Sequence, residues 1–284
     1  VTTVGITTGG GNVDVSTVNG ALTVDDAVNA GAGNVVLTAN ETDGAAEDAD
    51  DEDITLDDNV TGTTVTLDAA DDISQTAGAV TATNLRVLAA EGTDTADADS
   101  SLGTASLTSV TNNVAVLAAS RTSVTAGVTL TLTYVDADDL SIGTVTTVGI
   151  TTGGGNVDVS TVNGSITVSQ QVNATTAGNV TLTTAETAEG TAADVTVNAL
   201  VTGALVKVTS ADGATDGASG SITATSLVIR AGAGSIAATV TLDNVANDTD
   251  NLAATRNSGT GTVVLTYVDA DDVTITTVDT VVGI

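Results

Sequence analysis

The feature that most constrains the fold is a short phrase of alternating apolar and small polar residues, which returns along the 284-residue chain. Examples are GNVVLTA at 33–39, TTVTLDA at 63–69, GNVTLTTA at 178–185 and GTVVLTYV at 261–268. Apolar residues two apart have the period of a β-strand that buries one face. Clusters of Gly, Asn and Asp, which favour turns, separate the phrases. The pattern predicts an all-β fold built from many short strands.

Two long internal repeats organise the chain. TTVGITTGGGNVDVSTVNG at residues 2–20 recurs unchanged at 146–164, and TYVDADDLSIGTVTTVGI from Thr133 is closely matched from Thr266. We therefore divide the chain into long repeats at 1–145 and 146–284, with no linker between them. The last three residues match Val148–Ile150, which lead into TTGGG in the first copy. We expect a periodic excerpt of a longer array, or a protomer whose end meets the next protomer's start.

The composition favours a narrow core. The chain has no Phe, Trp, Met, Cys or Pro, while 41% of its residues are hydrophobic. Small branched side chains fill a thin interior between strands, and a chain without proline can commit its N–H groups to β-ladders. The phrase spacing predicts coils of about 20 to 25 residues with two or three strands each, a parallel β-solenoid or β-helix. The alternative is tandem β-sandwich modules, whose cores usually need aromatic anchors, and only Tyr134 and Tyr267 are available.

One form of the phrase resembles a known family. GAVTATNLRVLAA at 78–90 and GSITATSLVIRA at 220–231 are similar to the degenerate repeats of filamentous haemagglutinin-like adhesins. The resemblance covers most of the chain as a pattern and implies a right-handed parallel β-helix that is exported and displayed on a bacterial cell surface. The chain lacks the secretion domain expected at the family's N-terminus, and it is more acidic than the family pattern.

The charge balance limits the partners. Five basic residues stand against 36 acidic ones, a formal net charge of -31. This charge repels phosphate backbones and anionic lipid, so we expect no nucleic acid partner and no membrane insertion. It favours divalent cations or a salty environment that screens the self-repulsion. We see no signal peptide and no run of 18 apolar residues, and we expect the segment to derive from a longer exported protein.

The motif YVDADD is the main candidate site because it occurs once in each long repeat. Residues two apart share one face of a strand, so the first two aspartates of each motif could converge on one cation if the strand persists. We expect Ca²⁺, which binds carboxylate oxygens. The alternative is a polar turn after the strand. The candidate ligands are Asp136, Asp138, Asp139, Asp269, Asp271 and Asp272.

A second candidate calcium site lies in the most acidic stretch, ETDGAAEDADDEDITLDD at 41–58. Flexible loops rich in carboxylates can give Ca²⁺ the six to eight oxygens that it takes, although the order of an EF-hand is absent. A solvated loop is the alternative. The candidate ligands are Asp48, Asp50, Asp51 and Asp53.

The sequence favours a structural role over an enzymatic one. The chain has no His and no Cys, and Lys207 is its single lysine, which excludes most acid/base, thiol and Schiff-base arrangements. We expect a segment of an extracellular fibre, sheath or adhesin whose partner is itself, end to end, with host or matrix glycans as further partners. The alternatives are a carbohydrate-active β-helix enzyme, with paired carboxylates in a groove, and a surface-layer or ice-binding protein.

Overall fold

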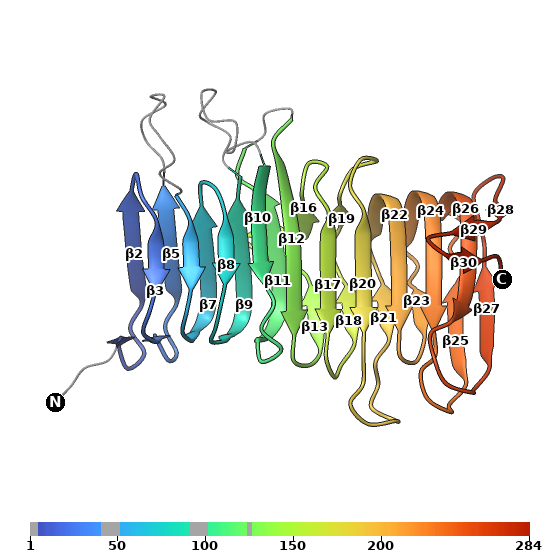
Figure 1. Cartoon of the computed structure of the whole chain (residues 1–284), viewed down its shortest axis with the longest axis horizontal. Helices are drawn as coiled ribbons and strands as arrows, with labels where there is room; N and C mark the ends of the chain where they lie inside the picture. The colour runs from blue at the N-terminus through green and yellow to red at the C-terminus, as the bar shows by residue number, and fades with distance from the viewer. Residues whose placement is uncertain (1–4, 41–51, 91–101, 124–126) are drawn as a thin grey trace. The chain divides into compact units, whose positions relative to one another are not determined.

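The computed structural model describes residues 5–40, 52–90, 102–123 and 127–284, and these residues form β-strands and no helix. The chain divides into two compact units: unit 1 holds Val1–Asp136 and Thr144–Gly153, and unit 2 holds Ala137–Gly143 and Gly154–Ile284. Within each unit the strands of successive coils pair in parallel (Figure 1). The predicted parallel β-solenoid is therefore confirmed, because β-sandwich modules would pair their strands antiparallel.

Unit 1 has three rows of stacked strands, which we name A, B and C. Row A contains β1 (Ile6–Thr7), β4 (Val28–Asn29) and the beginnings of β7 (Val60–Ala69), β9 (Val80–Ala89) and β11 (Asn113–Arg121). Row B contains β2 (Val13–Val18), β5 (Val35–Asn40) and the ends of β7, β9 and β11. Row C contains β3 (Leu22–Val24), β6 (Ile54–Leu56), β8 (Ile73–Gln75), β10 (Leu102–Leu107) and β12 (Thr129–Asp136).

Unit 2 is built in the same way. Its row A contains β19 (Val172–Asn173) and the beginnings of β22 (Leu200–Ser210), β24 (Ser221–Ala231) and β26 (Asp248–Arg256). Row B contains β17 (Val157–Thr161), β20 (Val180–Thr184), the later parts of β22, β24 and β26, and β28 (Thr274–Ile275). Row C contains β13 (Leu140–Ile142), β18 (Ile166–Val168), β21 (Val195–Val197), β23 (Ala214–Asp216), β25 (Ala238–Leu242) and β27 (Val263–Tyr267).

Some coils are longer than the predicted length of about 20 to 25 residues. In row B of unit 1, Val13 pairs with Val35 and Val65 pairs with Leu85, which are steps of similar length along the chain. The next step in the same row is much longer, because Leu85 pairs with Leu117. The strands pair in parallel across all of these unequal steps, so the ladder does not fix the length of a coil.

The core consists of aliphatic columns. Leu37, Leu67, Val87 and Ala119 pair in succession along row B of unit 1, and each is at most 1% exposed. Side chains alternate between inside and outside along each strand, so every second residue enters a column. Burying an aliphatic side chain of this size stabilises the fold by about 1.5–3 kcal/mol relative to leaving it exposed. The predicted narrow core of small branched side chains is therefore observed.

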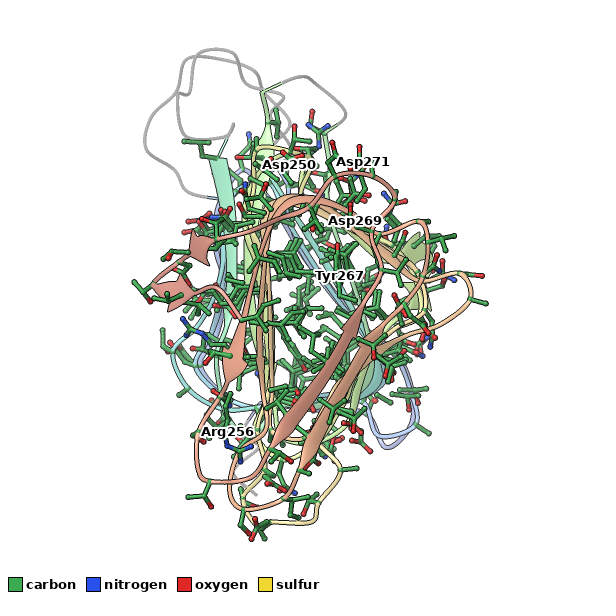
Figure 2. All side chains as sticks on the ribbon, turned by 90° about the vertical axis from the view of Figure 1, so that its right-hand side faces the viewer. Asp250, Arg256, Tyr267, Asp269 and Asp271 are labelled. Atoms are coloured by element: carbon green, nitrogen blue, oxygen red, sulfur yellow. The ribbon has the colours of Figure 1, made fainter. Side chains whose placement is uncertain are left out.

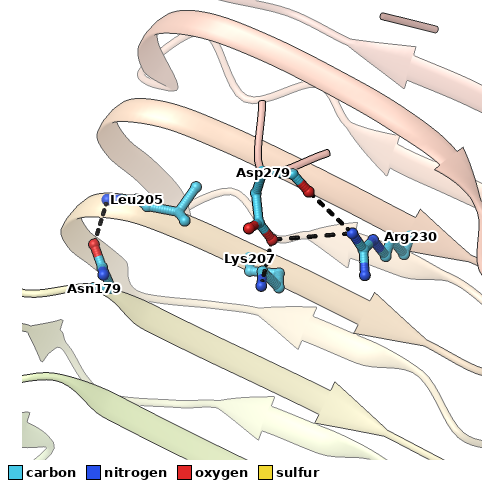
Figure 3. A network of polar contacts seen from close by, with 5 residues as sticks. All are labelled: Asn179, Leu205, Lys207, Arg230 and Asp279. Atoms are coloured by element: carbon cyan, nitrogen blue, oxygen red, sulfur yellow. Dashed lines mark hydrogen bonds and ion pairs between the residues drawn. The ribbon is translucent and has the colours of Figure 1, made fainter. Parts of the chain in front are cut away.

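Asparagines link the turns that precede row B. The side-chain oxygen of Asn12 accepts a hydrogen bond of 2.9 Å from the N–H of Asn34, and the Asn34 oxygen accepts one of 3.2 Å from the N–H of Thr64. Unit 2 has the same contact, in which Asn179 accepts from the N–H of Leu205 at 3.2 Å (Figure 3). Each amide oxygen therefore satisfies a donor of the following coil.

The described residues of each unit include an antiparallel hairpin, which we call a strap. In unit 1 the strap pairs β14 (Thr144–Val145) with β15 (Thr147–Val148) and is followed by β16 (Ile150–Thr151), which joins β11 in parallel. In unit 2 it pairs β29 (Thr277–Val278) with β30 (Val281–Val282). In unit 2, Val281 packs with Val228 and Ala253 on the outer side of row B. This strap therefore covers apolar residues that the coil leaves outside its own core.

Candidate functional site

The YVDADD motif of unit 1 begins inside the coil. The Tyr134 hydroxyl donates a hydrogen bond of 2.6 Å to Oδ2 of Asp136, and the backbone N–H of Val114 donates one of 3.0 Å to the same oxygen. Tyr134 and Asp136 are both 0% exposed. A buried carboxylate requires such donors, because its desolvation is otherwise very costly. Asp136 thus joins β12 to the neighbouring β11.

Asn112 extends this polar network, and sequence reasoning missed it. Its Oδ1 accepts hydrogen bonds from the N–H of Val80 at 2.8 Å and from Gln75 Nε2 at 2.9 Å. Its Nδ2 donates to the carbonyls of Val135 at 3.2 Å and Leu107 at 3.3 Å. Asn112 is 0% exposed and so bonds four neighbouring segments inside the coil. Its sequence signal is the pair Asn112–Asn113, a residue type that is common in turns.

The second copy of the motif has the same geometry and lies at the end of unit 2 (Figure 2). Tyr267 donates to Oδ2 of Asp269 at 2.6 Å, and the N–H of Thr249 donates to that oxygen at 3.0 Å. Burial, followed by the hydrogen bond to Asp269, raises the pKa of Tyr267 above its usual value of 10.0. Here Tyr267 and Asp269 are partly exposed, whereas their counterparts in unit 1 are buried.

The other aspartates of the two motifs lie on the surface. Strand β12 ends at Asp136, so Asp136 is buried while Asp138 and Asp139 are exposed, and the strand does not continue to Asp138 as the calcium prediction required. Oδ1 of Asp139 accepts a hydrogen bond of 2.7 Å from the N–H of Ser165. In unit 2, Asp271 and Asp272 are likewise exposed. These exposed aspartates follow the strand in a polar turn, which was the alternative prediction for the motif.

Within the described part of the chain, no three acidic side chains are grouped closely enough to hold a metal ion. Asp48, Asp50 and Asp51 lie outside the described residues. Oδ1 of Asp53 accepts a hydrogen bond of 3.0 Å from the N–H of Asp72 in the following coil. Calcium binding stays a prediction.

Among the described residues, Asp194 and Asp212 are neighbouring carboxylates of the kind that an enzyme would use. Burial, and then the negative charge of Asp212, raise the pKa of Asp194. However, Oδ2 of Asp212 accepts a hydrogen bond of 3.0 Å from the N–H of Ala193, so it joins neighbouring coils as Asp53 does. These contacts support a structural role for the pair.

The strap of unit 2 is held by charge (Figure 3). Lys207 Nζ lies 2.5 Å from Oδ2 of Asp279, and Arg230 Nη2 donates to the Asp279 carbonyl at 3.2 Å. The hydrogen bond from Lys207 and then its charge hold the pKa of Asp279 below its usual value of 3.8. In unit 1 a cation also holds the strap, but its acceptor is neutral: Arg86 Nε donates to Oγ1 of Thr147 at 2.8 Å.

The end of unit 2 exposes part of its core. On β27, Val263, Leu265 and Tyr267 are partly exposed, whereas the corresponding Leu130 and Leu132 of β12 are 0% exposed. A cavity of about 320 Å³ opens beside this strand; its lining includes Ala254, Arg256, Val263, Leu265, Val282 and Ile284. We call the surface formed by β27 and this cavity the end face.

No protein-family model, curated protein or solved structure matches this chain. The likeness to filamentous haemagglutinin-like adhesins therefore rests on the two quoted phrases and stays a prediction. Among the described residues there is no helix of a length and hydropathy that would allow it to cross a membrane.

Proposed function

We propose that this chain is a structural segment of an extracellular fibre, sheath or adhesin at a cell surface, and that its solenoid continues end to end. The observation that carries the proposal is the parallel pairing of successive coils throughout the described part of each unit. Unpaired strand edges readily pair with another strand. In the first repeat, β12 is followed by residues 146–164, and this sequence recurs unchanged at residues 2–20. The chain therefore contains a second copy of the sequence that follows this strand.

The mechanism of such a segment is mechanical. Within each unit, parallel ladders join every coil to the next, and the aliphatic columns run along these ladders. In a solenoid each coil contacts only its neighbours, so the rod lengthens as coils are added while the loops stay available for recognition. We propose that the loops carry contacts to host or matrix glycans and that acidic loops bind Ca²⁺.

Electron microscopy of native material containing this chain tests the proposal, with calcium and again after chelation. Filaments are the expected result, and discrete particles under both conditions would overturn the fibre. Filaments that loosen on chelation would support a role for calcium, because the metal would offset repulsion between carboxylates. Filaments that chelation leaves unchanged would support the proposed fibre and would overturn the proposed role of Ca²⁺. Hydrolysis of acidic glycans by the pure chain would favour the carbohydrate-active enzyme instead.

A further inference from the structure

Each unit has a turn after row C that ends in a buried asparagine. Asn112 ends the turn of unit 1, and Asn247 ends that of unit 2; both are 0% exposed. Each accepts a hydrogen bond of 2.8 Å from a backbone N–H of the preceding coil. Each also donates one of 3.3 Å to the carbonyl five residues before it. The turns at 108–112 and 243–247 therefore correspond residue by residue.

One position of these turns has a different side chain in each unit. It is Asn244 in unit 2 and Ser109 in unit 1, and in both turns its carbonyl accepts a hydrogen bond from the N–H of the buried asparagine. Nδ2 of Asn244 donates to the carbonyls of Gly217 at 3.1 Å and Ala218 at 3.3 Å, in the turn of the preceding coil. The Ser109 hydroxyl is too short for this contact and shares a hydrogen bond of 2.8 Å with Thr111 in its own turn. Asn244 therefore fills a space that Ser109 leaves open.

The open space in unit 1 is a pocket of about 370 Å³. Thr76 stands where unit 2 has Gly217, because each donates its N–H to the last residue of the row C strand one coil earlier. Ala77 then corresponds to Ala218. Within the described part of unit 1, no group donates to the carbonyl of Thr76 or of Ala77. The pocket therefore presents the same two carbonyl acceptors without the amide that binds them in unit 2.

The walls of the pocket are polar and uncharged. They include hydroxyl groups of Thr76, Thr108, Ser109 and Thr111 and the side-chain amides of Asn59 and Gln75. Hydroxyl groups both donate and accept hydrogen bonds, so these walls suit a ligand that has several hydroxyl groups of its own. A volume of about 370 Å³ is within the range of small-molecule sites.

The pocket is rigid on its inner side and acidic at its rim. Gln75 is fixed there, because its Oε1 accepts a hydrogen bond of 3.0 Å from the N–H of Ser109 and its Nε2 donates one of 2.9 Å to Asn112. At the rim, the hydroxyl of the lining residue Thr76 donates to Asp57. The adjacent Asp58 accepts a hydrogen bond of 2.9 Å from the side-chain amide of a second lining residue. These carboxylates repel anions, so the pocket favours a neutral ligand.

We propose that this pocket, between the turns at 76–78 and 108–111 of unit 1, binds one neutral sugar residue of a glycan. Two hydroxyl groups of the sugar donate to the carbonyls of Thr76 and Ala77, as the amide of Asn244 does to the equivalent carbonyls of unit 2. The inference rests on the proposed function, because it assigns the contact with glycans to one pocket. The equivalent turn of unit 2 binds no sugar, since Asn244 already fills the space.

NMR titration of the isotope-labelled 284-residue chain tests the pocket with glucose, galactose, mannose and N-acetylglucosamine. A Kd on the order of 1 mM is expected for a single sugar residue in an open polar pocket. At least one of the four sugars should shift the amide signals of Ala77, Ser109 and Thr111. Glucuronic acid should bind about fivefold more weakly than the best neutral sugar, because Asp57 and Asp58 repel its carboxylate.

Ser109→Asn is the main test variant, because it places the side chain of unit 2 in the pocket and unit 2 shows that such a turn accommodates it. Binding should weaken by at least about tenfold, as expected for a central contact residue, while the circular dichroism spectrum stays unchanged. Thr108→Ala removes one exposed hydroxyl from the wall and should weaken binding about two- to tenfold. The matched control is Ser219→Asn, the same substitution at an exposed turn residue of unit 2, which should leave binding unchanged.

The outcomes separate this pocket from the proposed fibre. No shift with any of the four sugars, or shifts that Ser109→Asn leaves unchanged, would overturn the inference. Equal shifts with glycerol at the same concentration would also overturn it, because glycerol has hydroxyl groups but no sugar ring. Filaments of native material without sugar binding would support the fibre and not the pocket. Sugar binding that Ser109→Asn abolishes, together with discrete particles by microscopy, would support the pocket and overturn the fibre.

Discussion

The two tyrosines provide a matched pair of substitutions, Tyr134→Phe and Tyr267→Phe. Each removes one hydroxyl that donates a 2.6 Å hydrogen bond to an aspartate two residues later. The chemistry is the same at both sites, while the exposure differs: Tyr134 and Asp136 are 0% exposed, whereas Tyr267 and Asp269 are partly exposed. Any difference between the two effects therefore reports burial.

The expected magnitudes follow from this difference. A hydrogen bond to a charged group stabilises a protein by about 1.5–3 kcal/mol, and a buried acceptor that loses its donor keeps its desolvation cost. Tyr134→Phe should therefore lower the free energy of unfolding by about 1.5–3 kcal/mol. At the second site water can replace the lost hydroxyl, so Tyr267→Phe should cost less than about 1 kcal/mol.

Urea unfolding followed by circular dichroism measures both effects, because this signal does not depend on the tyrosines themselves. The two variants are compared with the unsubstituted chain at the same protein and salt concentrations. Two equal losses, or a larger loss for Tyr267→Phe, would show that burial of the motif in unit 1 does not strengthen its hydrogen bond. The structural account of Asp136 would then be wrong.

Three further predictions follow from the core, the strap and the end face. Leu85→Ala empties part of a buried column and should cost about 2–5 kcal/mol in urea unfolding, while Leu102→Ala, at an exposed site, should stay within about 0.5 kcal/mol. The pKa of Asp279 is lowered in the folded state, so its contribution is complete above pH 3.8 and is lost as the pH falls below that value. The protection of the amide groups in residues 277–282 against hydrogen exchange, relative to the intrinsic rate at each pH, should therefore fall under acid, and Asp279→Asn should already show the reduced protection at neutral pH. The pKa of Tyr267 is raised in the folded state, so stability should fall as the pH rises above 10.0, and Tyr267→Phe should reduce this alkaline loss in thermal melts.

Much of the fold could be predicted from local pattern. Alternation with period two identifies the strands, and the phrase at 63–69 lies within β7 as expected. The near absence of aromatic residues correctly indicates a narrow core. Coil length was harder to predict, because Leu85 pairs with the distant Leu117 and nothing local marks how far along the chain a partner lies. Loop length has a weak effect on stability, so the sequence is little constrained there.

The straps could not be predicted from the same pattern. TVTTV at 144–148 alternates like any coil strand, yet it folds back on itself as an antiparallel hairpin. Its turn is made by Thr146 with a φ of 61°, a conformation that normally favours Gly or Asn. Alternation with period two occurs in parallel and in antiparallel strands alike, so it does not distinguish a hairpin from a coil strand. Thr146 is not a residue type that indicates such a turn.

The position of the candidate site could be predicted from the sequence, but the hydrogen bonds that it makes could not. The repeated YVDADD drew attention to Asp136 and Asp269, and both take part in equivalent hydrogen-bonding networks. Their partners Val114 and Thr249 act through backbone N–H groups, which are the same in every residue and leave no trace in a sequence. Side chains in contact across coils are separated by variable stretches of chain, so their proximity appears only once the register is known.

The unequal coils have a practical consequence. The step from Val65 to Leu85 is much shorter than the step from Leu85 to Leu117, yet both bring successive strands of unit 1 into parallel pairing. Coil length and ladder geometry are therefore independent variables. A new peptide could be grafted between two rows without altering the columns inside. For an evolving lineage, the same independence would let surface features diversify by insertion while the parallel ladders stay unchanged.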